Sequence, residues 1–239
     1  MTYGICNLSA IALRKENRHT SEMVSQLLYN ETYTILDKSP EWVLIQTHSD
    51  HYEGWIQAKQ LCEISEEDYN ALDDKKPYFI NKAIAESKGK YLTLGTPIYE
   101  PHPDAVEMPT DFHPELMVDY AKLLLGSPYL WGGRTAFGID CSGLVQVCAR
   151  LSGLLLPRDA SQQMEYGELV YFLQETQPGD LAFFGNEEGR ITHVGIVMGN
   201  EQIIHASGQV RIDYLDQTCI FNKELNTHTH RLQVIKRLV

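Results

Sequence analysis

A cysteine stands between an acid and a Ser-Gly pair in the stretch FGIDCSGLV, where a glycine-rich loop runs into an apolar segment. At the first turn of a helix, unpaired backbone N–H groups favour a thiolate and lower the pKa of a thiol below its ordinary value. The small neighbours Ser142 and Gly143 leave room for a substrate, although a glycine costs about 1 kcal/mol relative to alanine inside a helix. These features permit Cys141 to act as a nucleophile, and a small hydrophobic core residue is the alternative until further residues are considered.

A thiol nucleophile needs a base, and the base needs a polar partner that orients it. His193 lies in RITHVGIVMG, a predicted strand that is apolar on both faces, where a histidine is costly unless it is hydrogen-bonded or used. His205 lies in the next predicted strand, QIIHASG, so the two imidazoles are expected opposite or diagonal to each other. Either ring alone is explained as well by a core histidine bonded to a backbone carbonyl.

Metal-binding patterns are weak in this sequence. The five cysteines contain no CxxC pair, which argues against a disulfide framework and against a zinc knuckle, so we expect reduced thiols. His228 and His230 in NTHTHR lie in a polar turn without a third ligand, whereas zinc sites use three or four protein ligands. We therefore predict no metal and no cofactor.

The charge balance excludes one class of partner. Lys and Arg number 20 and Asp and Glu 32, which gives a net charge of −12 at pH 7. Binding to nucleic acids depends on Lys and Arg neutralising phosphates, so we expect no nucleic-acid partner. A small substrate held locally fits better, and we expect the chain to act as a monomer.

No membrane or targeting segment is evident in the sequence. A membrane helix needs roughly 18 uninterrupted apolar residues, and no such run occurs. The start MTYGICNLSAIALRKE has no basic region, no continuous apolar stretch and no small-residue cleavage site. We therefore expect no membrane partner and a cytoplasmic location; removal of a leader would instead indicate a periplasmic or exported protein.

The elements that must position these residues lie in the second half of the chain. Helical spacing of apolar residues predicts helices in HPELMVDYAKLLLG and CSGLVQVCARLSG, with Gly126 and Gly153 as their stops. On the second helix Cys148 falls on the apolar stripe, which predicts core packing. GDLAFFG, THVGIVMG, QIIHASG and RLQVIKRL are predicted strands. Helices followed by an antiparallel run of strands indicate an α+β fold.

The first half of the chain reads as short strands separated by turns. CNLSAIALR, ETYTILDK, EWVLIQTH and YEGWIQAKQL predict four strands of a small all-β barrel. The order SEMVSQLLYNETYTIL, EWVLIQT and YEGWI resembles a bacterial SH3-like domain, with the Gly-Trp-Ile of YEGWI as its best mark. We assign this barrel to residues 1–62.

The following segment predicts a second small domain. EISEEDYNALDDKK is expected to form a short helix or a solvated loop, and YFINKAIAES with KGKYLTLGTPIYE a strand pair around Ser87-Lys88-Gly89. The proline-rich stretch PHPDAVEMPTDFHP is typical of a linker. We assign residues 63–110 to a second, degenerate SH3-like barrel with this linker, and residues 111–239 to the catalytic domain.

The motifs of the second half resemble one family. YLWGGRTAFGIDCSGLVQ, PRDASQQ, QPGDLAFFG, THVGIVMG and IIHASG, in this order, are similar to the NlpC-type branch of papain-like cysteine peptidases, which cleave bacterial cell-wall peptides. The resemblance implies a papain-like fold with helices packed on an antiparallel sheet. It also implies that Cys141 is the nucleophile, His193 the general base and His205 the residue that orients the base.

The resemblance extends to substrate-binding positions. Tyr129 in the Y-x-W-G-G pattern is similar to a residue that helps line the oxyanion region, and Ser142 lies beside the nucleophile. Asp159 resembles an acid that binds the free amino group of the substrate in relatives with SH3-like domains. In those relatives a serine follows the acid, whereas here Ala160 follows and Ser161 comes next.

Relatives of this kind also use the N-terminal barrel to bind the substrate amine. Glu22 in SEMVSQ and Tyr52 in HYEGW are the matching positions. An ammonium held between carboxylates and a phenol hydroxyl forms charge-assisted hydrogen bonds, which are the stronger class. A surface glutamate and a barrel aromatic are the alternative interpretations of these two residues.

The resemblance implies a cysteine endopeptidase that hydrolyses the bond from γ-D-glutamate to an L-diamino acid in murein peptides with a free N-terminal L-Ala. We expect such an enzyme to act in cell-wall peptide turnover and recycling. An acyltransferase or amidase on the same scaffold is the second hypothesis, since the same thiol chemistry serves acceptors other than water. A non-catalytic peptide-binding protein built on the SH3-like modules is the third.

Overall fold

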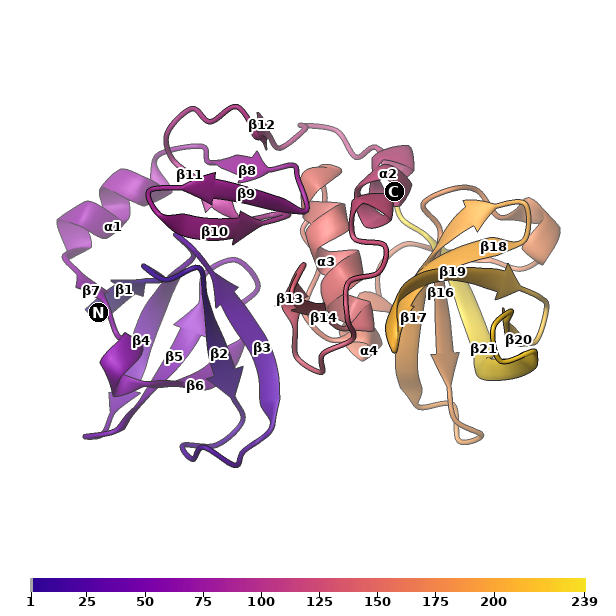
Figure 1. The fold of residues 1–239 in the computed structure, drawn as a ribbon, viewed down its shortest axis with the longest axis horizontal. Coiled ribbons are helices and arrows are strands. Elements are labelled where there is room, and N and C mark those ends of the chain that lie inside the picture. Colours follow the sequence, from indigo (N-terminus) through magenta and orange to yellow (C-terminus); the bar gives the residue numbers. More distant parts are fainter. Residues whose placement is uncertain (1) are drawn as a thin grey trace. The chain divides into compact units, whose positions relative to one another are not determined.

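The computed structural model describes residues 2–239, which fold as two compact units (Figure 1). Unit 1 comprises the residues up to Met108 together with Leu130–Gly138, and unit 2 comprises Pro109–Tyr129 with Ile139–Val239. Among the described residues, no helix has the length and apolarity that crossing a membrane requires.

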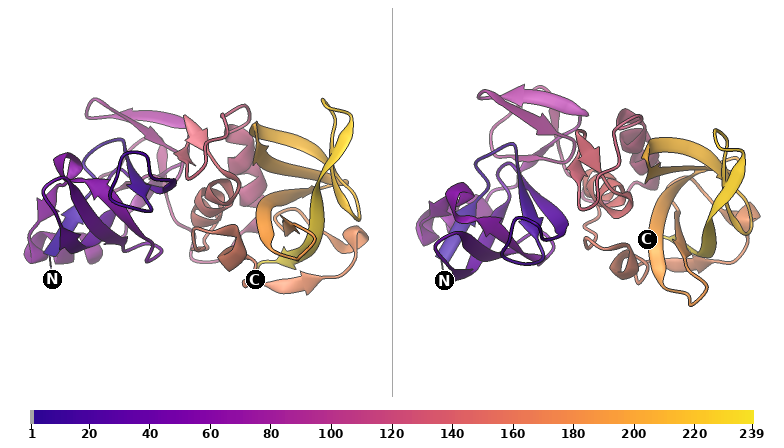
Figure 2. Two further views of the ribbon diagram at one scale, coloured as in Figure 1. Left: turned by 90° about the horizontal axis from the view of Figure 1, so that it is seen from below. Right: turned by 60° about the horizontal axis from the view of Figure 1, so that its bottom comes forward.

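Unit 2 contains helices packed on a closed antiparallel sheet. Helix α2 (Pro114–Leu123) and helix α3 (Cys141–Leu151) both pack against strands β17 and β18. The strand order is β15-β21-β16-β17-β18-β19-β20, and a further pairing of β20 with β21 closes six of these strands into a barrel (Figure 2). The predicted α+β class is confirmed. The strands are β15 Glu168–Val170, β16 Leu181–Gly185, β17 Ile191–Gly199, β18 Gln202–Ser207, β19 Gln209–Leu215, β20 Cys219–Asn222 and β21 Thr227–Arg237.

Both predicted helices and the four predicted strands of this half are present, whereas β15, β19 and β20 were not predicted. The helices end near glycines, as expected: Gly126 and Gly153 have φ values of +81° and +99°. At Gly153 a Cβ atom would lie 2.4 Å from the carbonyl oxygen of Asp111. A larger residue would therefore push this segment away from the start of α2.

The barrel of unit 2 has an apolar interior to which each of its six strands contributes. Because side chains alternate along a strand, one face of each strand points inward. The inward cluster consists of Ala182, Phe184, Val197, Ile203, Leu215, Ile220 and Ile235, each at most 4% exposed. Burial of such side chains stabilises the fold by about 1.5–3 kcal/mol each, and the barrel is therefore a rigid support for polar groups at its end.

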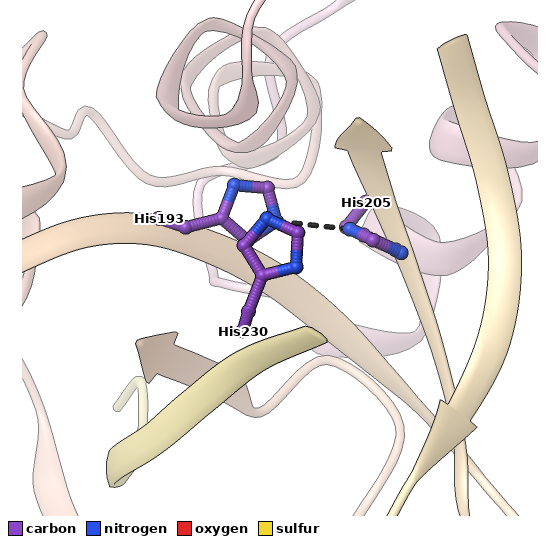
Figure 3. Close-up of side chains that lie close together, drawn as sticks. All are labelled: His193, His205 and His230. Atoms are coloured by element: carbon purple, nitrogen blue, oxygen red, sulfur yellow. Dashed lines mark hydrogen bonds between the residues drawn. The ribbon is translucent and has the colours of Figure 1, made fainter. Parts of the chain in front are cut away.

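Three histidines stand at one end of this barrel (Figure 3). His193 shares the inward face of β17 with Val197, and His205 shares that of β18 with Ile203, by the alternation of the strands. His230 lies near the start of β21, and its imidazole contacts both of the other rings. The antiparallel pairing brings the start of β17, the end of β18 and the start of β21 to the same end of the barrel.

Unit 1 begins with a seven-stranded antiparallel sheet in the order β3-β2-β6-β5-β4-β1-β7. The four predicted strands of this region correspond to β2, β4, β5 and β6, while β1, β3 and β7 were not predicted. The bounds are β1 Thr2–Ile5, β2 Ala10–Arg14, β3 Met23–Leu28, β4 Thr32–Lys38, β5 Trp42–Thr47, β6 Glu53–Gln57 and β7 Glu63–Ile64.

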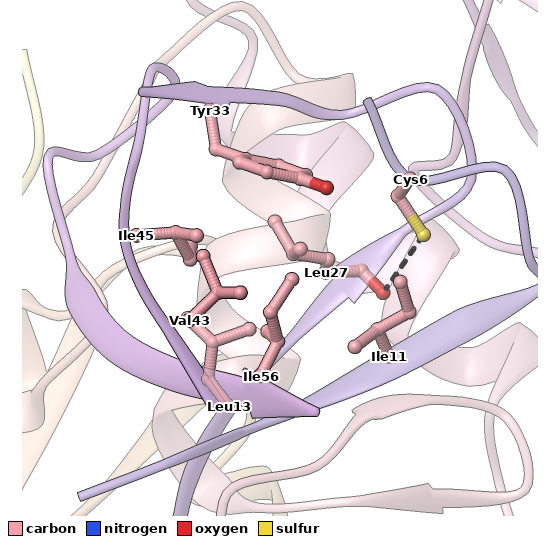
Figure 4. Close-up of a cluster of buried hydrophobic side chains, with 8 residues drawn as sticks. All are labelled: Cys6, Ile11, Leu13, Leu27, Tyr33, Val43, Ile45 and Ile56. Carbon is pink, nitrogen blue, oxygen red and sulfur yellow. Dashed lines mark hydrogen bonds between the residues drawn. The ribbon is translucent and has the colours of Figure 1, made fainter. Parts of the chain in front are cut away.

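Alternating apolar residues of these strands form one core (Figure 4). Its members are Cys6, Ile11, Leu13, Leu27, Tyr33, Val43, Ile45 and Ile56, each at most 1% exposed. A Cβ atom at Gly54 would lie 3.0 Å from Cβ of Leu13 and 3.3 Å from the carbonyl oxygen of Arg14. The glycine of the YEGWI motif thus allows β6 to lie close to β2.

The segment after this barrel forms smaller elements. Helix α1 (Glu66–Asp73) begins at Ser65, whose Oγ accepts a 3.0 Å hydrogen bond from the backbone N–H of Asp68. Strands β9 (Ile84–Ser87) and β10 (Lys90–Thr93) form a hairpin with Ser87 opposite Lys90, so the predicted strand pair is confirmed. Strands β8 (Tyr78–Ile80), β11 (Pro97–Ile98) and β12 (Ala105–Glu107) form a separate sheet. The predicted second SH3-like domain covers these elements and stays a prediction.

A loop from the second half of the sequence packs with unit 1. Arg134 in strand β13 (Arg134–Thr135) donates from Nη1 to Oε2 of Glu31 at 2.8 Å and from Nη2 to Oε1 at 3.0 Å. The side chains are 1% and 4% exposed. A charge buried to this degree needs a partner, because its desolvation costs several kcal/mol. We had assigned this loop to the catalytic domain by its motif, and the ion pair explains why it packs with the barrel.

Candidate active site

Cys141 is the first residue of helix α3, as predicted. The preceding residue, Asp140, has extended backbone angles and its Oδ1 accepts a 2.7 Å hydrogen bond from the backbone N–H of Gly143. This is an N-cap, which typically stabilises a helix by about 1 kcal/mol. The cap fixes where α3 begins, and the thiol is therefore held at its N-terminal turn.

A buried arginine holds this turn from outside the helix. Arg158 donates from Nη2 to Oδ2 of Asp140 at 2.6 Å and from Nη1 to Oδ1 at 3.0 Å. Its Nη1 also donates to Oγ of Ser142 at 2.8 Å. The bidentate geometry orients the carboxylate as well as neutralising it. The residues on both sides of Cys141 are thereby fixed by one guanidinium group.

The two predicted imidazoles form a relay between neighbouring strands. Nε2 of His193 and Nδ1 of His205 are 2.9 Å apart. The residue opposite His205 on β17 is Gly195, so His193 is diagonal to His205, which was one of the two predicted arrangements. A Cβ atom at Gly195 would lie 3.0 Å from Cβ of His205. The glycine leaves the space through which the two rings meet.

A carboxylate that we did not predict completes the relay. Oδ2 of Asp213, in β19, lies 3.2 Å from Nε2 of His205 and accepts a 2.6 Å hydrogen bond from Nε of Arg211. Burial alone would raise the pKa of Asp213, but hydrogen bonds from His205 and Arg211 outweigh it and hold the pKa below its usual range. Asp213 is therefore ionised at neutral pH and can only accept hydrogen bonds.

The ionised carboxylate determines which ring nitrogens carry protons. Nε2 of His205 must donate to Asp213, which leaves Nδ1 of His205 as an acceptor. Nε2 of His193 must then donate to that acceptor. The remaining nitrogen, Nδ1 of His193, carries a lone pair. The relay thus sets His193 in the tautomer that a general base needs.

The thiol lies against the strand that carries this base. Hydrogen bonding from the backbone of Val194, the residue after His193, and from the backbone of Ser142 favours its thiolate form. α3 and β17 pack together directly. The structure therefore places Cys141 beside the strand that carries His193, and the ring of His193 beside that of His205, all within unit 2.

The ionisation state of the thiol differs from our expectation. Burial and the neighbouring Asp140 carboxylate raise the pKa of Cys141 to about 12, and the backbone hydrogen bonds only partly offset this. Burial also lowers the pKa of His193 well below its ordinary value, with further effects of His230 and His205. The prediction of a lowered thiol pKa was wrong, because the field of the helix was considered without the burial of the sulfur. Both shifts favour the neutral forms of the thiol and the imidazole.

The predicted substrate-binding residues of unit 2 differ in their burial and in the elements that carry them. Tyr129 is half-buried, and its pKa is raised by burial and by the electrostatic effects of Cys141 and Asp140. Ser142 is 6% exposed, and its hydroxyl bonds Arg158. Asp159 immediately precedes the short helix α4 (Ala160–Gln163), which carries Ser161 on an exposed position and packs against α3 and β17.

The two predicted residues of unit 1 lie in its first barrel. Oε1 of Glu22 accepts a 2.7 Å hydrogen bond from Nε1 of Trp131. Oε2 of Glu22 lies 3.7 Å from Nζ of Lys15. Tyr52 is half-buried and packs against the barrel core. Their role in binding the substrate amine stays a prediction.

Three residues that contact the predicted site residues escaped sequence reasoning. Arg158 was within reach, because PRDASQQ was recognised as a motif, but only its acid was interpreted. Asp213 lies on β19, which was not predicted. His230 was read together with His228 as a pair without a third ligand, whereas folding brings His230 to His193 and His205 and brings His228 to Asp216 and Cys219. Each group of three has the side-chain types of a metal site.

Comparisons with known proteins agree with these motifs. Residues 126–229 match the NlpC/P60 family, and residues 13–61 match the bacterial dipeptidyl-peptidase Sh3 domain. The gamma-D-glutamyl-L-lysine dipeptidyl-peptidase of Bacillus subtilis (strain 168) is 29% identical over 234 residues, which cover 84% of this chain and 78% of that protein. A protein of the same description from Bacillus cereus (strain ATCC 10987 / NRS 248) is 25% identical over 230 residues, covering 79% of this chain and 68% of that protein.

One solved structure matches nearly the whole chain. The crystal structure of an NlpC/P60 family protein from Bacillus cereus ATCC 10987 covers 98% of this chain and 99% of its own, with a TM-score of 0.80 and 20% sequence identity. Because the sequence identity is 20%, this match supports the fold of the two units and not their function. The predicted papain-like peptidase fold is thereby confirmed.

Proposed function

Because the chain carries an NlpC/P60 domain and an SH3 domain of the bacterial dipeptidyl-peptidase type, and is a cysteine peptidase, we propose that it hydrolyses peptidoglycan peptides at the bond between γ-D-glutamate and an L-diamino acid. The observation that carries this proposal is the relay from Asp213 through His205 to His193 beside the thiol of Cys141. The names of the two Bacillus relatives support the substrate class.

The proposed reaction begins from the neutral thiol and the neutral imidazole. As the sulfur of Cys141 bonds to the γ-carbonyl carbon, its proton moves to Nδ1 of His193. The imidazolium that forms is stabilised through His205 by the charge of Asp213. His193 then returns the proton to the amine of the diamino acid as the C–N bond breaks. Water hydrolyses the resulting thioester and restores the thiol.

Stabilisation of the oxyanion is assigned to the start of α3. The first N–H groups of a helix have no acceptor within the helix, and Asp140 satisfies that of Gly143. We assign the backbone N–H of Cys141 to the developing negative charge, with the phenol of Tyr129 lining the same region. Donors of this kind contribute roughly 100- to 1,000-fold to the rate when they are fixed in place.

We also propose that the substrate has a free N-terminal L-Ala. The relatives are named dipeptidyl-peptidases, and Asp159 at the start of α4 supplies a carboxylate in unit 2 for an ammonium group. An N-acetylated substrate removes that positive charge, and it is expected to be cleaved about 10- to 100-fold more slowly. The process that such a reaction would serve is cell-wall peptide turnover, including recycling.

Product analysis tests the proposed function. Purified protein incubated with L-Ala-γ-D-Glu-L-Lys should release lysine and L-Ala-γ-D-Glu in equal amounts, and the Cys141→Ala variant should release neither. Transfer of the dipeptide to an added amine in preference to water would instead support an acyltransferase. Binding of the tripeptide without any cleavage would support a peptide-binding protein and contradict the proposal.

A further inference from the structure

The imidazoles of His193, His205 and His230 form a compact cluster (Figure 3). One ring nitrogen from each residue lies within 4.8 Å of those of the other two. The rings of His193 and His230 stack with centroids 4.1 Å apart, and the centroids of His205 and His230 are 5.7 Å apart. The proposed peptidase reaction uses two of these rings and gives no role to His230.

The surroundings of the cluster orient the rings as in a metal site. In such sites a ligating histidine usually donates its second ring nitrogen to a carboxylate or another oxygen. His205 makes this contact through Nε2 with Asp213 at 3.2 Å, which leaves Nδ1 toward the cluster. His230 makes it through Nδ1 with Oγ1 of Thr229 at 3.0 Å, which leaves Nε2. Two of the three candidate ligands are thus already oriented.

We propose that His193, His205 and His230 bind a divalent transition-metal ion and that the bound ion inactivates the general base. Three imidazole nitrogens suit Zn²⁺ and its neighbours in the transition series rather than Mg²⁺ or Ca²⁺, which take oxygen ligands. With Zn–N bonds of about 2.0–2.1 Å, three tetrahedral ligand nitrogens lie about 3.4 Å apart. The 2.9 Å separation between Nε2 of His193 and Nδ1 of His205 therefore widens by about 0.5 Å, and a longer separation to His230, at most 4.8 Å, shortens. His230, which is only partly buried, provides the route from solvent.

Inactivation follows from the positions of the protons. In the relay, Nε2 of His193 carries the proton that it donates to His205. Nε2 must give up that proton to bind a metal, and a neutral ring then carries its proton at Nδ1. No proton is gained or lost overall, because His205 and His230 keep theirs at Nε2 and Nδ1. With Nδ1 protonated, His193 has no lone pair for the thiol of Cys141.

Two other sets of ligands compete with this assignment. The thiol of Cys141 with His193 is one, because thiolates bind zinc strongly. Asp216, Cys219 and His228 form the other, on β20, β21 and the turn before them, where Oδ2 of Asp216 lies 3.0 Å from Nε2 of His228. A test of the proposal must remove both.

The binding test uses Zn²⁺ and a full-length Cys141→Ala/Cys219→Ser variant, which lacks both competing thiols. Isothermal titration calorimetry after EDTA treatment and dialysis is expected to show one Zn²⁺ per chain. Adding His230→Phe, which keeps a flat ring against His193, is expected to weaken binding at least tenfold. Circular dichroism of both variants verifies that they are folded. Absence of a site in the first variant, or equal affinity in the two, would overturn the proposal.

The activity test uses Cys219→Ser protein with its catalytic thiol intact. Zn²⁺ is expected to inhibit cleavage of the tripeptide, and His230→Phe is expected to raise the inhibition constant at least tenfold. Equal inhibition of both proteins would assign the zinc to Cys141 and contradict the proposal. This arm rests on the peptidase activity proposed above, whereas the calorimetric arm does not. Zinc binding by a chain that cleaves nothing would therefore reject the proposed function and retain the metal site.

Discussion

The two ends of helix α3 carry chemically identical groups in different surroundings. Cys141 begins the helix and Cys148 lies near its end, with exposed fractions of 6% and 0%. Burial raises the pKa of both thiols. At the first turn, backbone hydrogen bonding and the nearby Arg158 oppose that effect, whereas burial is the whole cause at Cys148.

The comparison shows that burial alone does not separate a nucleophile from a core residue. Cys148 has no polar partner that shifts its pKa, so it behaves as a small hydrophobic side chain. Cys141 lies against β17, which carries His193, and hydrogen bonds connect His193 to His205 on β18 and His205 to Asp213 on β19. What distinguishes the two thiols is a relay that can accept a proton.

Replacing Cys141 and Cys148 in turn is expected to give the largest difference in kcat between two variants. Cys141→Ala is expected to lower kcat by roughly 1,000-fold or more, because the bond-forming atom is lost. Cys148→Ala is expected to keep kcat within about threefold and to lower the free energy of unfolding by about 1–2 kcal/mol through the lost packing. Steady-state cleavage of L-Ala-γ-D-Glu-L-Lys and urea denaturation measure the two effects. Similar kcat values for the two variants would contradict the assignment of Cys141 as the nucleophile and Cys148 as a core residue.

Loss of the arginine that holds the first turn should have the next largest effect. Arg158→Met removes the cation that pairs with the buried carboxylate of Asp140, and breaking such a pair costs about 3–5 kcal/mol of unfolding free energy. Lys122→Met on α2 is the control, since its 3.2 Å pair with Asp119 is exposed and contributes at most about 1 kcal/mol. Urea midpoints of the two variants give the comparison. Equal midpoints would show that the guanidinium group does not stabilise this turn.

Removing the charge of Asp213 tests whether this carboxylate fixes the tautomer in which His193 acts as a base. Asp213→Asn removes the charge that forces Nε2 of His205 to donate, and kcat is expected to fall about 10- to 100-fold with little change in KM. Asp216→Asn serves as control, because its carboxylate contacts the exposed His228. It should change kcat less than threefold. A wild-type kcat in Asp213→Asn would mean that the tautomers are fixed by other groups.

The pH dependence of alkylation sharpens the comparison of the thiols further. Only the thiolate reacts, and the pKa of Cys141 is raised to about 12, so its thiolate fraction rises with pH throughout the range below 12. The rate of iodoacetamide labelling is therefore expected to increase by about tenfold per pH unit between pH 7 and 9. Cys148 should react more slowly at each pH. Mass mapping of labelled peptides measures both, and a plateau for Cys141 would indicate a stable thiolate–imidazolium pair.

Much of the fold could be predicted because its signals are local. Short stretches of sequence are enough to show the apolar face of α3 and the glycine at position 153 that follows its end. The same holds for the runs of apolar residues in β16 and β17. The placement of His193 and His205 opposite or diagonal to each other followed from two neighbouring strands joined by a short turn, and only the structure gives the diagonal register. The fold was accessible for this reason, whereas the roles of Cys141 and His193 as nucleophile and base were implied by the resemblance to the NlpC-type family.

The missed parts depend on long-range contacts. Strand β19 was not predicted because RIDYL has no continuous apolar pattern, and Asp213 was missed with it. His230 meets the relay because β21 pairs with β16 and β20, with irregular register at both. The pKa of Cys141 was predicted in the wrong direction because burial of the sulfur depends on elements far from it in sequence.

The most direct test of the account is to capture the covalent intermediate. Wild-type protein mixed with excess L-Ala-γ-D-Glu-L-Lys is quenched in acid within one turnover, and its peptides are mapped by mass spectrometry. The account predicts L-Ala-γ-D-Glu attached as a thioester to the peptide that contains Cys141, with the Cys148 position unmodified. Continued release of lysine by Cys141→Ala at the wild-type rate, with no acylated cysteine in the wild type, would contradict it.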